Sequence, residues 1–145
     1  MHDLEAFNLE IKVEKPPVWE EAHKHFKIVD EATVYTYGDI LYNPANITID
    51  ILLMEHEKTH AAQQKAYEGG PEAWWRRYFE DVEFKNDQDF EAYWNQYRLF
   101  CTLVKSIDKR FMYRWKLAGE FTGAIPGKPY GRVQICTMLK TAIHK

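Results

Sequence analysis

The sequence has 145 residues and a formal net charge of −3 at pH 7, with 46% hydrophobic and 15% aromatic residues. These values predict one folded domain over residues 1–145 rather than a disordered chain, and they give no electrostatic basis for nucleic-acid binding. No apolar run is long enough to span a membrane, and the first residues lack the basic and apolar regions of a signal peptide. We therefore expect a cytoplasmic protein.

The first part of the chain carries short alternating or β-branched segments that are typical of a small sheet. The first alternating segment ends at Pro16 and Pro17, and a short helix is expected directly after them, at residues 18–25. Gly38 and Asp39 permit a turn between the last two segments. We predict a small antiparallel sheet formed by residues 8–14, 26–29, 33–37 and 40–42.

The rest of the chain is predicted to be mostly helical. The helix after the strands is expected to start at a cap supplied by Asn46 or Thr48 and to end at about residue 68, before two glycines and a proline. Asp87 or Asp89 is the expected cap of a long aromatic helix that contains Glu91. The later helices are expected at 72–79, 90–106, 109–117 and 132–143. Together these elements predict an α+β fold in which the small antiparallel sheet packs on a bundle of about four to five helices.

Residues 56–60 read His-Glu-Lys-Thr-His, the HExxH pattern, within the first long helix. Residues four apart lie on the same face of a helix, so His56 and His60 can share one Zn²⁺. Glu57 can then serve as the general base for a metal-activated water. The pattern predicts zinc-assisted hydrolysis on the central helix of a zincin-like domain, and the simpler alternative is two ordinary helix histidines.

A catalytic zinc usually takes three protein ligands, so one ligand has to lie outside the motif. Gln63 and Ala66 stand where the metzincin pattern needs a glycine and a histidine, which excludes that class. Glu68 would lie about 12 Å beyond His60 on the same helix. The aromatic pattern of the later helix favours Glu91 as third ligand over Glu80. The acidic candidates are Glu68, Glu72, Glu80, Asp81, Glu83 and Glu91.

A larger ordered pattern surrounds the motif. It consists of Tyr-Gly-Asp-Ile-Leu-Tyr-Asn-Pro at 37–44, the motif with two trailing glutamines at 56–64, Trp-Trp-Arg-Arg-Tyr at 74–78, Phe-Lys at 84–85, and Phe-Glu-Ala-Tyr-Trp-Asn-Gln at 90–96. This order, with Tyr-Gly at 130–131, resembles the small HExxH proteins of phages and bacterial genomes that are described as zinc metallopeptidases of gluzincin type. The resemblance covers roughly residues 35–135. It implies that Glu91 is the third ligand.

The resemblance implies a zinc-dependent metallopeptidase or amidase that acts on a peptide or a cell-wall amide. If the chain is phage-encoded, we expect it in the host cytoplasm or in the virion. The alternative is a metal-stabilised, non-catalytic binding or virion-associated protein. Tyr113, Tyr130 and His144 are the candidates for a donor to the oxyanion, and the segment 35–42 could bind an extended peptide by strand addition.

Overall fold

The computed structural model describes residues 4, 7–26, 32–123 and 131–144. Of residues 143 and 144 only the backbone is described. These residues contain six helices and a three-stranded mixed sheet, with 68% of the structure helical, so the α+β prediction is confirmed. The chain forms two compact units, Met1–Gln88 and Asp89–Lys145, which are described separately. No described helix has the length and apolar character needed to cross a membrane.

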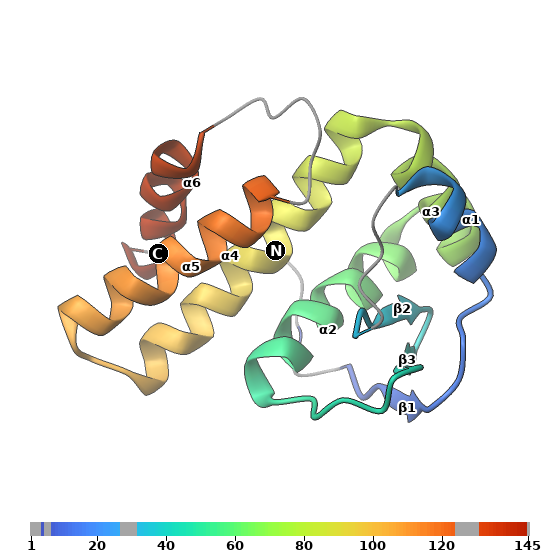
Figure 1. The fold of residues 1–145 in the computed structure, drawn as a ribbon, viewed down its shortest axis with the longest axis horizontal. Coiled ribbons are helices and arrows are strands. Elements are labelled where there is room, and N and C mark those ends of the chain that lie inside the picture. The colour runs from blue at the N-terminus through green and yellow to red at the C-terminus, as the bar shows by residue number, and fades with distance from the viewer. Residues whose placement is uncertain (1–3, 5–6, 27–31, 124–130, 145) are drawn as a thin grey trace. The chain divides into compact units, whose positions relative to one another are not determined.

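The sheet of the first unit contains β1 (Glu10–Lys12), β2 (Tyr35–Tyr37) and β3 (Ile40–Tyr42), in the order β1-β3-β2 (Figure 1). The hairpin of β2 and β3 is antiparallel, and Gly38 supplies its turn with a φ of +65°. The prediction of a wholly antiparallel sheet is wrong, because β1 runs parallel to β3. Parallel neighbours need a crossover connection, and helix α1 (Trp19–His25) lies within that connection. The expected strand at 26–29 falls almost entirely outside the described residues.

The HExxH pattern lies within helix α2 (Ile51–Ala66), which contacts β2 and helix α3 (Gly70–Glu80). Asp50 caps α2, because its carboxylate accepts a hydrogen bond of 2.8 Å from the backbone N–H of Leu53. The predicted caps, Asn46 and Thr48, are therefore wrong. The turn into α3 depends on Gly69, whose φ of 96° is left-handed.

Two apolar clusters hold α2 and α3 against the sheet. Leu41 of β3 packs with Leu9 and Ala61 beneath α2. The aromatic cluster centres on the buried Trp74 and Trp75 of α3 and is completed by Val18, Ala22, Tyr35, Tyr42 and Phe84. Because large aromatic side chains bury 150–250 Å² each, these two tryptophans dominate the contact between α3 and the rest of the first unit.

Helix α4 (Val82–Leu103) starts eight residues before the predicted start at residue 90, and the predicted caps Asp87 and Asp89 lie inside it. Its N-terminus is held by Asp81, whose Oδ1 accepts a hydrogen bond of 3.1 Å from the backbone N–H of Phe84. That bond keeps the pKa of the Asp81 carboxyl below its ordinary value. Glu80 thus ends α3, whereas Asp81 and Glu83 lie at the start of α4, where carboxylates are favourable.

The second unit consists of the later part of α4 together with α5 (Ile107–Gly123), α6 (Arg132–Leu139) and the 3-10 helix η2 (Lys140–His144). Its core contains Tyr97, Leu117, Ile135 and Leu139. The predicted end of α5 at residue 117 is wrong, because the helix continues through Gly119. A Cβ atom at Gly119 would meet the guanidinium of Arg132 at 2.7 Å, so this glycine provides room for a close contact rather than a helix end.

Candidate metal centre

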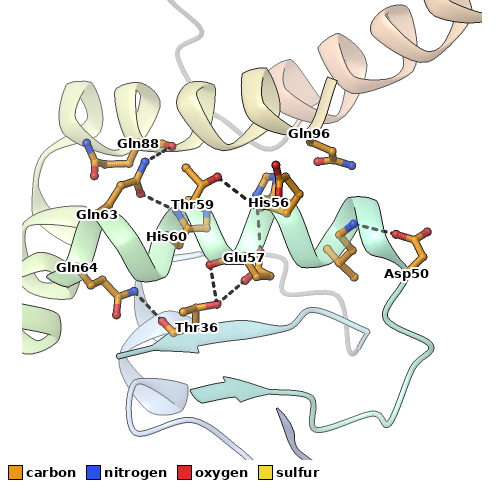
Figure 2. Close-up of polar contacts among 12 residues, drawn as sticks. Thr36, Asp50, His56, Glu57, Thr59, His60, Gln63, Gln64, Gln88 and Gln96 are labelled. Atoms are coloured by element: carbon orange, nitrogen blue, oxygen red, sulfur yellow. Dashed lines mark hydrogen bonds and ion pairs between the residues drawn. The ribbon is translucent and has the colours of Figure 1, made fainter. Parts of the chain in front are cut away.

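His56, Glu57 and His60 bring their ligand atoms together on α2. One such atom from each residue lies within 4.8 Å of the other two. The ring centroids of His56 and His60 are 5.0 Å apart, and the Nε2 atom of His56 lies 3.8 Å from Oε2 of Glu57. His60 and Glu57 are buried, at 8% and 5% exposure. The three side chains thus form a compact, largely enclosed donor group (Figure 2).

Gln63 fixes the proton position on His60. Its Nε2 donates a hydrogen bond of 3.0 Å to the backbone carbonyl of Gln88, and a carbonyl can only accept. The amide oxygen must then face His60, and it lies 2.8 Å from Nδ1 of the imidazole. Nδ1 therefore carries the proton and donates it. In this tautomer Nε2 is the ring nitrogen that would bind a metal ion.

Thr36 of β2 holds the carboxylate of Glu57. The Thr36 hydroxyl lies 3.1 Å from Oε1 of Glu57 and 3.4 Å from the Glu57 backbone carbonyl oxygen. Thr36 is 1% exposed, so this donor is shielded from water. Figure 2 shows Glu57 and Gln64 pointing from α2 toward β2, whereas Gln63 points toward Gln88. The contact that holds Glu57 therefore lies on a different side of α2 from the contact between Gln63 and Gln88.

Gln64 joins α2 to the turn of the hairpin. Its Oε1 accepts a hydrogen bond of 2.7 Å from the backbone N–H of Gly38, and its Nε2 donates one of 2.8 Å to the carbonyl of Thr36. Trp75 donates a second bond to that carbonyl, through Nε1 at 3.0 Å. These contacts, of which the two to the Thr36 carbonyl are buried, set the position of β2 along α2, and hence the position of the Thr36 hydroxyl beside Glu57.

Aromatic side chains form one wall beside His60. The ring of Trp74 lies 5.5 Å from the imidazole, and the ring of Tyr78 lies 6.4 Å away. Trp74 is itself anchored, because its Nε1 donates a hydrogen bond of 2.8 Å to Oε1 of Gln88. The same residue, Gln88, thus receives one bond from α2 and one from α3, which fixes the start of α4 against both helices.

The other sequence-predicted residues have different outcomes. Glu91 lies on α4 in the second unit and is half-buried; its role as third ligand stays a prediction. It occupies the middle of α4 rather than the expected first turn. Tyr113 belongs to the second unit, where its hydroxyl accepts a bond of 2.8 Å from Gln96. Tyr130 and the side chain of His144 lie outside the described residues.

Strand addition at β2 meets an obstacle at Thr36. A carbonyl oxygen has two lone pairs, and that of Thr36 already accepts from Gln64 and Trp75. A peptide strand along this edge would have to displace both donors to pair with residue 36. We therefore do not retain this segment as a peptide-binding strand.

In the comparisons with known proteins, no family model, curated protein or solved structure matches this chain. The case for a function therefore depends on the residues themselves. Thr36 is the site residue that sequence reasoning did not select. Its only signal is its place between two tyrosines in a strand, which does not indicate that its hydroxyl reaches a glutamate 21 positions later.

Proposed function

We propose that this protein is a zinc-dependent hydrolase, a metallopeptidase or amidase, that cleaves a peptide or cell-wall amide bond. The observation that carries the proposal is the donor group of His56, Glu57 and His60, whose ligand atoms lie within 4.8 Å of one another. The orientation of His60 by Gln63 supports it, since metal-binding histidines commonly donate their second ring N–H to an oxygen.

The side chains of His56, Glu57 and His60 are of the types that bind zinc. Neutral imidazole nitrogens and a carboxylate are preferred zinc ligands. His56 and His60 would hold the ion, and Glu91 is proposed as the third ligand on the strength of the sequence resemblance. That arrangement would leave Glu57 outside the ligand set, where its carboxylate could accept a proton.

The proposed mechanism assigns one task to each residue. A bound zinc would act as a Lewis acid that polarises the amide carbonyl and lowers the pKa of the attacking water. Glu57 takes a proton from that water at Oε2, because Oε1 already accepts from Thr36. Glu57 then transfers the proton to the amine nitrogen that leaves as the C–N bond breaks. Thr36 keeps the carboxylate oriented through both transfers.

A second candidate function is a metal-stabilised binding protein without hydrolytic activity. The observation that favours it is that the Glu57 carboxylate is itself close enough to both imidazoles to be a ligand. A site built from His56, Glu57 and His60 would use its only described base as a ligand. In that case Glu57 would be occupied by the metal and could not accept a proton from water.

Glu57→Gln separates the two functions. If Glu57 is the base, the variant should keep the wild-type zinc content while losing at least about 100-fold in activity on a panel of peptides and peptidoglycan. If Glu57 is a ligand, the variant should lose zinc. His60→Ala is the matched control, because it should lose zinc under both functions. A wild-type protein that holds zinc but hydrolyses none of the panel would overturn the hydrolase proposal.

A further inference from the structure

The outer edge of the sheet is formed by β1. In the sheet order β1-β3-β2, only β3 pairs with β1 among the strands that the structure describes. The backbone N–H of Glu10 donates to the carbonyl of Asp39 at 3.0 Å, and the carbonyl of Lys12 accepts from Asn43 at 2.8 Å. Glu10 and Lys12 therefore direct their backbone groups toward β3. Ile11 lies between them, so its N–H and C=O point to the outside of the sheet.

The same edge exposes apolar side chains. Ile11 lies within β1, Leu9 directly precedes the strand, and Val13 directly follows it. Leu9 is buried in the core beneath α2, but Ile11 and Val13 are 46% and 58% exposed. Exposed apolar side chains thus lie on β1 and directly after it. Unpaired edges with exposed apolar residues are the places where another strand adds to a sheet.

We infer that a second copy of this chain pairs with β1, antiparallel and centred on Ile11. In that register Ile11 faces Ile11 of the other copy, and the two residues exchange both backbone hydrogen bonds. Glu10 faces Lys12 of the other copy twice, once on each side of the two-fold axis. The two exposed Ile11 side chains then lie directly opposite each other and are in contact.

Charge selects this register over its neighbours. A shift by one residue would place Ile11 opposite Glu10 or Lys12 of the other copy. The backbone N–H and C=O groups of those residues point to β3, so they could not pair with the outward groups of Ile11. A shift that centres the pairing on Lys12 puts two lysines opposite each other. A shift that centres it on Glu10 puts two glutamates opposite each other. Because like charges directly opposite destabilise a ladder, only the pairing centred on Ile11 is complementary throughout.

The inferred interface lies away from the donor group within the first unit. Helix α2 contacts β2, at the edge of the sheet opposite β1 (Figure 1). Pairing through β1 would join two sheets without using β2 or the contacts of Thr36 with Glu57. A ladder of a few residues is a small interface, so we expect a transient dimer. This inference does not depend on the proposed hydrolase function.

Sedimentation equilibrium of the full chain over a range of concentrations tests the inference. Wild type should dimerise, and Glu10→Lys and Lys12→Glu should each raise the dimer dissociation constant at least about tenfold, since each creates two like-charge pairs. The double variant E10K/K12E should restore the wild-type value. Glu14→Lys is the matched control, because Glu14 lies in a bend beyond the end of β1 and its substitution should leave the constant unchanged.

Other results would overturn the inference. A wild-type protein that stays monomeric up to about 1 mM, where an affinity of only a few kcal/mol would still be detected, would exclude the dimer. Stronger association of the Glu10→Lys variant than of wild type would contradict the register centred on Ile11. A wild-type dimer that none of these charge changes weakens would place the interface elsewhere on the chain.

Discussion

The Nδ1 atom of His60 lies 2.8 Å from the Oε1 atom of Gln63, and the two residues are three positions apart on α2. Gln63 in turn donates a hydrogen bond to the backbone carbonyl of Gln88, whose position does not depend on any side-chain rotamer. His60, an expected metal ligand, is therefore oriented by Gln63, and Gln63 is oriented by the backbone of Gln88 in α4. Replacing Gln63 should therefore change how His60 binds zinc.

Gln63→Leu should lower zinc affinity about 10- to 100-fold, because the imidazole loses the acceptor that fixes its orientation and tautomer. Competition with a chromophoric chelator measures this without any assay of activity. Gln63→Glu keeps an acceptor for Nδ1 but loses the donor to the Gln88 carbonyl, so it should recover only part of the affinity. Lys65→Gln, at an exposed position on the same helix, is the control. Equal affinities for Gln63→Leu and wild type would show that the bond does not orient a ligand.

Thr36→Val removes the hydroxyl beside Glu57 at nearly constant volume. The buried carboxylate would then lack this donor, which should destabilise the fold by about 1–3 kcal/mol. If Glu57 is the base, kcat should also fall while zinc content is unchanged. Thr36→Ser keeps the hydroxyl and should recover most of kcat. Denaturant unfolding and zinc analysis on the same samples separate stability from positioning, and an unchanged kcat in the valine variant would remove Thr36 from the mechanism.

Gln64→Leu should destabilise the first unit more than Thr36→Val does. The substitution leaves the part-buried N–H of Gly38 without the acceptor that it has at 2.7 Å, and it removes one of the two donors to the buried Thr36 carbonyl. We expect a loss of about 2–4 kcal/mol in the free energy of unfolding, measured with urea. A change below about 0.5 kcal/mol would mean that the hairpin is not held by this side chain.

Tyr35→Phe should be neutral or stabilising at neutral pH, because the buried Tyr35 hydroxyl has no hydrogen-bond partner among the described residues. Burial also raises the pKa of Tyr35 above 10.0. A raised pKa contributes stability that is fully present below the unfolded-state value and is lost as pH rises through the folded-state value. Wild type should therefore lose stability above about pH 10 more steeply than the variant. Thermal unfolding between neutral and alkaline pH measures the difference, and parallel curves would contradict it.

The sequence by itself determined the elements whose signals are local. The helical spacing of the motif, the glycines before Pro71 and the strands around Gly38 each depend on neighbouring residues, and the structure has an element at each of these places. Local signals were less decisive where several residues could serve equally well. Asp50, rather than the expected Asn46 or Thr48, proved to be the cap of α2, and α4 starts at Val82, well before the expected caps Asp87 and Asp89.

Only the tertiary structure decided which distant groups meet at the motif. The crossover that makes β1 parallel to β3 and the contact of Thr36 with Glu57 both join residues more than 20 positions apart. No local preference encodes such pairs, because they form only when the sheet and helices pack together. The same holds for Gln63, whose spacing placed it beside His60 but whose amide orientation depends on the carbonyl of Gln88.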